Sequence, residues 1–369
     1  MKKSIDGYRA MTLNIIASIG QSGYGYHGLN VVRAATTLGI KVALWPSNGR
    51  PVDDENKITM LQAIANQLIY DYNMPSISIS PPSNLAFHVG KGARVGWTVF
   101  ELNKFTKYEL HQLSSQDLVL VPSNWAKDIV GRQLPDLPCH VVPEGVDQQI
   151  FNSHITLKEF PYGNKTVFIN VGKWEKRKAQ ELLLTAFEKA FDPHDDVILI
   201  LSCYNQFSQM NNAIWPELCR KSKLATKIIV CNKHYVSQNE IASLMAHADC
   251  GVFPSRAEGW NLELLEMMSM GKMVIATNYS AHTEYCSDNN CLLVYVDKLE
   301  PACDQQFFFG HGDWASLGDA QEEQLIIHMR TVHKLKQEGY DLINYSGVET
   351  ARSLSWENSV RQLTDAIKV

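Results

Sequence analysis

The sequence of 369 residues contains no long apolar run. A transmembrane helix needs roughly 20 consecutive apolar residues, and no segment reaches that length. The N-terminal stretch MKKSIDGYRAM lacks the apolar region and the small-residue cleavage site of a secretory signal. We therefore predict a soluble, cytoplasmic protein with no stable insertion into a membrane.

Signatures of metal sites are also missing. None of the 8 cysteines forms a CxxC pair, and no DxD pair of aspartates stands at the end of an expected strand. The adjacent Asp53 and Asp54 fall in an expected loop. The cysteines are therefore interpreted as buried free thiols, and no metal site is predicted.

The net charge is small. There are 34 basic and 39 acidic side chains, which gives −5. This balance argues against a protein that binds nucleic acid or acidic membranes through bulk charge, but it leaves a local basic groove open.

The chain is long enough for two domains, because single cores rarely grow beyond roughly 250–300 residues. Short apolar runs that alternate with amphipathic stretches predict buried parallel strands and helices, hence an α/β fold with two doubly wound sheets. The expected strands of the first half are Met11–Ile19, Lys41–Trp45, Ala86–Val89, Val95–Phe100 and Leu118–Pro122. Those of the second half are Thr166–Val171, Val197–Cys203, Lys227–Cys231, Cys250–Pro254 and Met273–Ala276.

Two glutamates eight positions apart mark the strongest motif, EGWNLELLE. Glu258 falls in the loop after an expected strand, and Glu266 lies about one turn into a helix that begins near Leu262, with Asn261 as its expected N-cap. The free N–H groups of such a helix start suit a diphosphate, and a carboxylate further along it suits the two hydroxyls of a ribose. From the residues alone, an N-capped helix with solvated glutamates is an equal alternative.

A basic turn forms the second motif, GKWEKRKAQELLLTAF. Lys173 and Lys178 stand between an apolar strand and a helix, where two cations could neutralise a leaving diphosphate without a metal ion. The alternative is a solvated basic turn.

Glycines follow the first expected strand, at Gly20, Gly23, Gly25 and Gly28. Glycines after a first strand occur in many α/β folds, and no acidic residue stands where a dinucleotide ribose would require one, so this loop is a weak signal by itself.

Together these segments resemble the retaining glycosyltransferases of family four, also described as glycosyl transferases group 1. EGWNLELLE is similar to the E-x7-E element of that family, and GKWEKRKAQELLLTAF to its phosphate-binding element. VVPEGVD resembles the interdomain segment, and LSWENSV the closing helix; GWTVFELNKF and GDWASL resemble a subgroup. The resemblance runs over most of the chain.

The resemblance implies a GT-B fold, in which two Rossmann-like domains face each other across a cleft. Residues 1–160 would bind the acceptor and residues 161–350 the nucleotide sugar, while residues 351–369 would pack back on the N-terminal domain. It also implies transfer with retention, no metal and no cofactor, the nucleotide sugar being a co-substrate.

The resemblance further assigns roles to individual residues. Lys173 and Lys178 would bind the diphosphate, Glu266 the ribose, and Glu258 the hydroxyls of the transferred sugar. The remaining donor-binding residues would be Gly259, Trp260, Asn261 and Leu262 beside the sugar, Tyr235 and Val236 at the base, and Gly23 and Gly25 beside the diphosphate.

Three positions depart from the family pattern. Lys173 stands in place of an arginine, so that a point charge replaces a bidentate fork. Ala179 and Asn261 each stand in place of a glycine, and the second change could alter sugar preference. Where many members have a histidine near the donor sugar, Glu101 is the candidate here, with a structural carboxylate as the equal alternative.

Other functions stay open at this point. A GT-B nucleotide-sugar epimerase, a transferase that acts on a modified DNA base and a non-catalytic sugar-nucleotide sensor would each use a similar scaffold. The acceptor is unknown: glycans, lipids and small molecules rank above DNA and protein.

Overall fold

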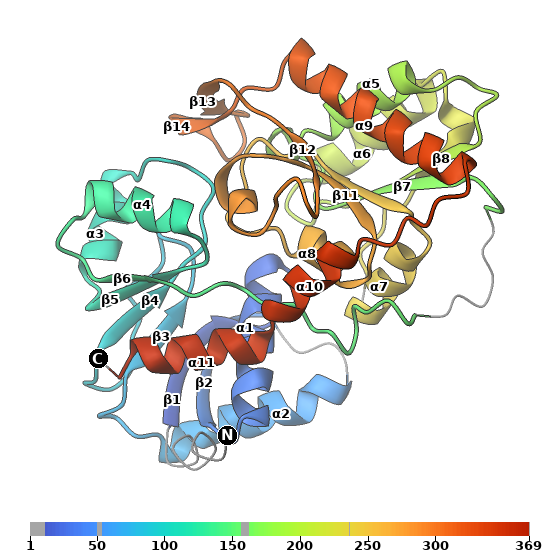
Figure 1. The fold of residues 1–369 in the computed structure, drawn as a ribbon. Coiled ribbons are helices and arrows are strands. Elements are labelled where there is room, and N and C mark those ends of the chain that lie inside the picture. The colour runs from blue at the N-terminus through green and yellow to red at the C-terminus, as the bar shows by residue number, and fades with distance from the viewer. Residues whose placement is uncertain (1–11, 50–53, 156–161, 236, 369) are drawn as a thin grey trace. The chain divides into compact units, whose positions relative to one another are not determined.

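The chain forms two compact units in the computed structural model, which describes residues 12–49, 54–155, 162–235 and 237–368 (Figure 1). One unit comprises Met1–Asp147 and Ser353–Val369, and the other comprises Gln148–Arg352. The boundary predicted at residue 160 falls within residues 156–161, outside the described residues.

The first unit is built on a parallel sheet of six strands in the order β2-β1-β3-β4-β5-β6. Its strands are β1 (Thr12–Ser18), β2 (Lys41–Asn48), β3 (Ser76–Ile79), β4 (Arg94–Trp97), β5 (Leu118–Val121) and β6 (Cys139–Val141). Its helices up to β6 are α1 (Gly23–Thr37), α2 (Asp54–Ala65), α3 (Lys107–Ser114) and α4 (Asn124–Gln133), with the short η1 (Asn66–Ile69) after α2.

Two features of this sheet differ from expectation. The strand expected at Ala86–Val89 is wrong: the segment has no ladder partner, and the Val89 N–H donates to the Ser76 hydroxyl instead, at 3.0 Å. Ser76–Ile79 forms a strand that was not expected. Its alternating sequence SISI is typical of a half-exposed strand, yet all four residues are buried between β1 and β4.

The end of the chain belongs to the first unit. Helix α11 (Trp356–Ala366) packs against α1, and the Val146 N–H donates to the Leu354 carbonyl at 2.9 Å. The Trp356 ring lies 5.4 Å from the buried ring of His27, whose Nδ1 contacts Glu144 at 2.7 Å. The VVPEGVD segment is therefore packed beside the closing helix.

The second unit has a sheet of the same kind, in the order β12-β11-β10-β7-β8-β9. Its strands are β7 (Thr166–Val171), β8 (Val197–Ser202), β9 (Ile228–Val230), β10 (Cys250–Phe253), β11 (Met273–Thr277) and β12 (Leu292–Val294). Its helices are η2 (Lys176–Lys178), α5 (Gln180–Ala190), α6 (Gln209–Lys221), η3 (Ala225–Lys227), α7 (Gln238–Ala246), α8 (Leu262–Ser269), η4 (Ser280–Glu284), α9 (Asp319–Gln337) and α10 (Tyr345–Ser353).

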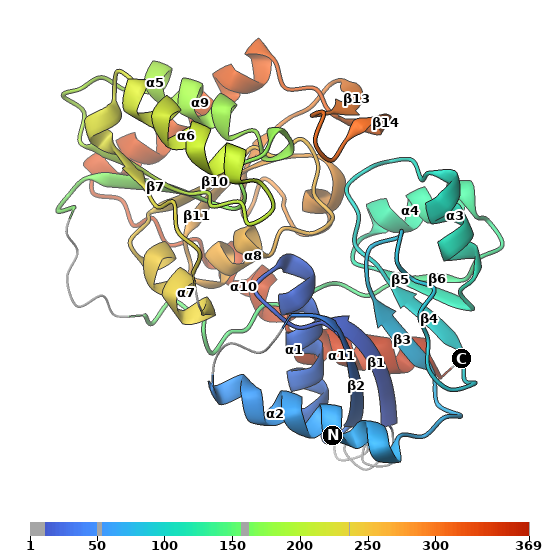
Figure 2. The ribbon, with the colours of Figure 1, turned by 180° about the vertical axis from the view of Figure 1, so that it is seen from behind.

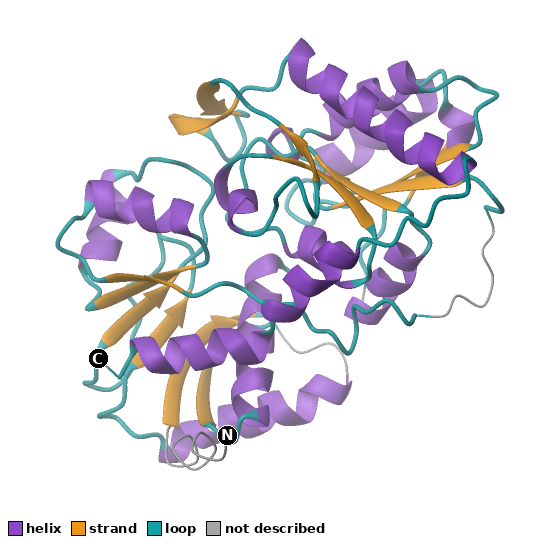
Figure 3. Ribbon diagram, in the orientation of Figure 1, coloured by secondary structure: helices purple, strands orange, loops and turns teal. Residues whose placement is uncertain are grey.

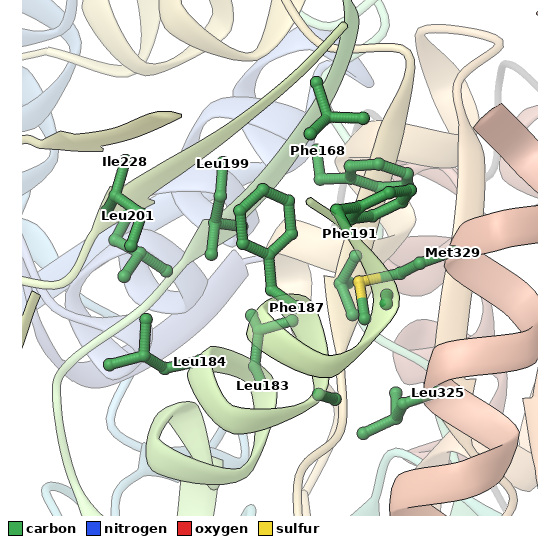
Figure 4. Packing of buried hydrophobic residues seen from close by; sticks show 14 of the residues in the cluster. Phe168, Leu183, Leu184, Phe187, Phe191, Leu199, Leu201, Ile228, Leu325 and Met329 are labelled. Atoms are coloured by element: carbon green, nitrogen blue, oxygen red, sulfur yellow. The ribbon is translucent and has the colours of Figure 1, made fainter. Parts of the chain in front are cut away.

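Helices cover both faces of the second sheet. Helices α5, α6 and α9 lie on one face and α7 and α8 on the other, which is also visible from behind (Figure 2) and in the colouring by secondary structure (Figure 3). Under the first face, Phe187 and Leu183 from α5 meet Phe168 and Leu199 from the sheet, and Met329 from α9 closes this cluster (Figure 4). Each such side chain contributes about 1.5–3 kcal/mol when fully buried.

The chain order of this sheet reverses at one point. From β7 the chain moves through α5 to β8 on one side, whereas β10 leads through α8 to β11 on the other side. Backbone pairing between β7 and β10 stops at Gly251↔Ile169, and the Asn170 side chain then donates to the Val252 carbonyl at 2.6 Å. The carboxyl ends at such a reversal form the crevice where open α/β sheets bind ligands.

An antiparallel hairpin is added to the second unit, formed by β13 (Leu299–Cys303) and β14 (Phe309–Ala315). It is fixed to the two loops at the reversal: Lys176 Nζ donates to the Cys303 carbonyl at 2.8 Å, and Arg256 Nη1 contacts Glu300 Oε1 at 2.6 Å.

Within the residues that the structure describes, no helix is long and apolar enough to cross a bilayer.

Candidate active site

The turn after β7 carries the lysines of the basic motif. Gly172 has φ 143°, and a Cβ atom there would lie 3.4 Å from Lys178 Cε, so the turn passes close over this side chain. Trp174 anchors the turn by stacking on Trp215, with ring centroids 5.3 Å apart. Lys178 ends the short η2 and is buried, while the Lys173 side chain is 37% exposed.

Ala179 completes this turn in the left-handed conformation, with φ 54° and ψ 36°. This explains why the family pattern has glycine here, since the left-handed region costs an L-residue roughly 1–2 kcal/mol. The departure is accommodated in the structure at the expense of backbone strain.

We expect Ala179→Gly to raise the free energy of unfolding of the second unit by about 0.5–1 kcal/mol, because relief of strain exceeds the added flexibility of the unfolded chain. Urea unfolding measures the difference. The matched control is Ala186→Gly inside α5, which should destabilise by about 1 kcal/mol. Destabilisation by both substitutions would show that Ala179 is not strained.

The loop after β10 carries the first glutamate. Its backbone is fixed where the Glu258 N–H donates to the Ser280 hydroxyl at 2.8 Å. Asn261 ends the loop with φ 85°, a conformation that glycine and asparagine tolerate best. Its side-chain oxygen accepts from the Leu264 N–H at 3.3 Å, so the predicted N-cap of α8 is confirmed.

A buried histidine holds this cap. His282 Nδ1 lies 2.9 Å from the Thr277 carbonyl, so this nitrogen carries the proton, and Nε2 accepts from the Asn261 amide at 2.9 Å. Burial lowers the pKa of His282 and outweighs the negative charge of Glu258, which would raise it. The imidazole is therefore neutral. Tyr285 supports the same loop by donating to the carbonyls of Trp260 and Asn261, at 2.9 and 3.0 Å.

The two motifs meet in a buried cluster of four charges. Lys178 Nζ lies 2.8 Å from Glu258 Oε1, and Arg177 Nη1 lies 2.7 Å from Glu258 Oε2. Arg177 Nη2 also contacts Glu175 Oε1 at 2.6 Å. Ser255 donates to Glu258 Oε1 at 2.6 Å. Two acids and two bases therefore balance each other, with every side chain buried.

The charges in this cluster stabilise one another. Burial would raise the pKa of Glu258, but Arg177 and Lys178 outweigh it and hold that pKa well below its ordinary value. Burial would also lower the pKa of Lys178, but Glu258 and Glu263 keep it above its ordinary value. Glu258 is ionised and Lys178 is protonated at neutral pH.

The remaining residues predicted in this unit lie on α8, in the loop before it and after β9. Glu266 is buried on α8. Leu262 begins that helix, and Gly259 and Trp260 lie in the loop before its N-cap. Tyr235 follows β9, and its pKa is raised mainly by burial, while Val236 lies outside the described residues.

The alternative of a helix with solvated glutamates is wrong for both motif residues. Glu258 is 4% and Glu266 7% exposed. A solvated basic turn is likewise wrong for Lys178, which is 7% exposed. Lys173 is partly solvated, because its side chain is 37% exposed. Its Nζ lies 3.8 Å from Glu175 Oε2 and 5.1 Å from the Phe207 ring centroid.

The other predicted residues belong to the first unit. Gly23 begins α1, and the Gly25 N–H donates to the N-cap Ser22 at 3.1 Å. A Cβ atom at Gly25 would lie 2.3 Å from the Gly20 carbonyl oxygen, so this turn requires glycine. Glu101 follows β4, and its charge acts on the buried phenol of Tyr24.

Sequence reasoning missed five residues of this site, which are Arg177, Glu175, Ser255, Ser280 and His282. Arg177 is part of the motif GKWEKRKAQELLLTAF, but the run KWEKRK does not indicate which of its side chains face inward and which are exposed. Ser280 and His282 lie beyond the EGWNLELLE motif in the chain, and only their contacts single them out.

The chain has the GT-B fold: its two parallel six-stranded sheets match solved glycosyltransferases of that class along almost their whole length. A sucrose-phosphate synthase from Thermosynechococcus elongatus aligns with a TM-score of 0.68 at 14% identity, covering 96% of this chain and 98% of that one. HepE from Anabaena, solved in complex with UDP and glucose, aligns with a TM-score of 0.68 at 15% identity, covering 97% and 99%.

Sequence comparisons show a similarity to one family of enzymes over part of the chain. Residues 165–304 match the model of the family described as glycosyl transferases group 1, which confirms the predicted resemblance. Phosphatidyl-myo-inositol mannosyltransferase from Mycobacterium tuberculosis is 24% identical over 230 residues, 60% of this chain and 56% of that enzyme. Residues 165–304 contain the whole charge cluster.

Proposed function

We propose that this protein is a retaining glycosyltransferase that moves a sugar from a UDP- or GDP-sugar to an acceptor hydroxyl without a metal ion. The observation that carries the proposal is the contact between Lys178 and Glu258 at the reversal of the second sheet. Both residues lie in the segment that matches group 1 glycosyltransferases.

The roles follow from charge and position. Lys178 and the more exposed Lys173 would bind the diphosphate and stabilise its charge as it leaves, assisted by the N-terminus of α8. Glu258 and the backbone N–H groups of residues 259–262 would bind hydroxyls of the transferred sugar. Glu266, further along α8, would bind the ribose, with Tyr235 beside the base.

In the proposed reaction the bond between the sugar and the diphosphate breaks first, which leaves an oxocarbenium-like sugar. The acceptor hydroxyl attacks on the face from which the diphosphate departs, and the departing phosphate takes the hydroxyl proton. The protein therefore contributes mainly positioning and charge stabilisation. A close carboxylate pair with one nucleophile, as in retaining glycosidases, is not required.

Thermal-shift screening with UDP- and GDP-sugars, followed by an acceptor screen with the best donor, tests the proposal. A donor at 100 times its Kd should stabilise the protein by about 2.7 kcal/mol. Conversion of the donor to another nucleotide sugar without an acceptor would identify an epimerase. A donor that binds but is neither transferred nor slowly hydrolysed would identify a sensor. If no donor binds, the proposal is contradicted.

We expect glycosyl transfer to survive excess EDTA. The positive charges of Lys173 and Lys178 would take the place of a metal ion on the diphosphate. The measurement compares initial rates with and without EDTA, and a third sample with added Mg²⁺ or Mn²⁺ serves as the control. Complete loss of activity that either metal restores would contradict a metal-independent mechanism.

A further inference from the structure

Arg177 is turned into the protein and is 4% exposed. Its guanidinium donates to Glu258 at 2.7 Å, to Glu175 at 2.6 Å and to the Ala257 carbonyl at 2.7 Å. An arginine engaged by two carboxylates and a carbonyl would have to give up these partners to bind a phosphate. Its task therefore lies within the protein.

The contacts of Arg177 connect the two motifs mechanically as well. The Arg177 carbonyl accepts from the Arg256 N–H at 2.7 Å, next to the bonds that its side chain makes to Ala257 and Glu258. The turn after β7 and the loop after β10 are thus joined through backbone and side chain at one residue.

The charge balance shows what Arg177 adds. Glu258 has two cationic neighbours, one on each carboxylate oxygen, and Glu175 compensates the second charge of the pair. Without Arg177, Lys178 would be the sole cation in contact with Glu258 among these four residues. A lysine wholly committed to a buried carboxylate has little charge to offer to an incoming anion.

We propose that Arg177 is a positioning residue that acts as the standing counterion of Glu258 and so leaves Lys178 available to an anionic leaving group. The proposal rests on the proposed function, because it assigns the anion to the diphosphate of the donor. Arg177 would not touch the donor itself.

The test uses a charge-balanced double variant, Arg177→Met with Glu175→Gln, because Arg177→Met alone leaves an excess of buried negative charge. Calorimetric binding of UDP and GDP should weaken by roughly tenfold or more, the scale of losing an interaction with a charged group. Arg177→Lys should recover part of this loss. The matched control is Arg256→Met, whose side chain contacts Glu300 instead of Glu258 and whose UDP and GDP affinities should stay at the parental value.

A second measurement, the dependence of urea unfolding on pH, does not require turnover. The charged groups near Glu258 are Arg177, Lys178 and Glu175 from the turn, and Glu263 through its action on Lys178. The neutral His282 from η4 is the further titratable group beside it. The low pKa of Glu258 provides stability at neutral pH that is lost as the pH falls toward that pKa. Without Arg177 that pKa rises toward its ordinary value, so the double variant should lose less stability than the parent as the pH falls, whereas Arg256→Met should follow the parent.

The outcomes separate this inference from the proposed function. Parental affinity together with a parental pH profile in the double variant would overturn the role of Arg177. If the parent binds neither UDP nor GDP, the proposed function fails, and the pH profile alone then decides whether Arg177 is the counterion of Glu258.

Discussion

Replacement of Lys178 by alanine is expected to lower kcat/KM for glycosyl transfer by roughly 10²-fold or more, the scale of losing one charge-stabilising donor. Lys178 is buried, protonated and 2.8 Å from Glu258. Steady-state kinetics with the donor identified by screening provide the measurement.

The control for this prediction lies two residues away. Lys176 is exposed and donates to the Cys303 carbonyl, so Lys176→Ala should change kcat/KM by less than about fivefold, as for other surface contacts. Circular dichroism establishes whether each variant is folded. A folded Lys178→Ala variant with near-normal turnover would remove Lys178 from the reaction.

The second large effect separates the two glutamates. Glu266→Ala is expected to weaken binding of both the free nucleoside diphosphate and the nucleotide sugar, because both contain the ribose. The loss of a hydrogen bond to a charged group costs about 1.5–3 kcal/mol, which corresponds to roughly 10–150-fold in Kd. Calorimetry with the free nucleotide measures this directly.

Glu258 should behave differently, and its burial determines the choice of substitution. Removal of the side chain would leave Arg177 and Lys178 without their shared partner, and breaking a buried pair destabilises by about 3–5 kcal/mol. Glu258→Gln keeps the shape and one acceptor. It should leave nucleotide affinity nearly unchanged and lower kcat with the sugar donor. The reverse pattern, in which Glu258→Gln abolishes nucleotide binding and Glu266→Ala does not, would exchange the two roles.

Much of the fold could be predicted because buried parallel strands are written as continuous apolar runs. Thr166–Val171 is an example, and all six of its residues are buried. The expectation failed where this rule is ambiguous. Ala86–Val89 is apolar enough for a strand, but the Val89 N–H donates to a side chain instead of a neighbouring strand. Ser76–Ile79 has an alternating sequence and is nevertheless a central strand.

The site could be predicted in part for a related reason. The N-cap at Asn261 follows from local chemistry, because a short polar side chain before a helix binds a backbone N–H a few residues ahead. The inward direction of Arg177 does not follow from local chemistry. It depends on a short 3-10 turn and on a left-handed alanine, and neither has a signature in a run of basic residues.

The sequence by itself determined the α/β class of this protein, the strands that form its cores and the two charged motifs, because these depend on local composition and spacing. Only the tertiary structure decided that the motifs form one cluster. Arg177 and Glu258 are 81 residues apart in the chain, and they meet because β7 and β10 are neighbours at the point where the strand order reverses. A buried acid needs a buried base within hydrogen-bond distance, because an unpaired buried charge is strongly destabilising. This requirement exists only in the folded chain, where both groups are removed from water.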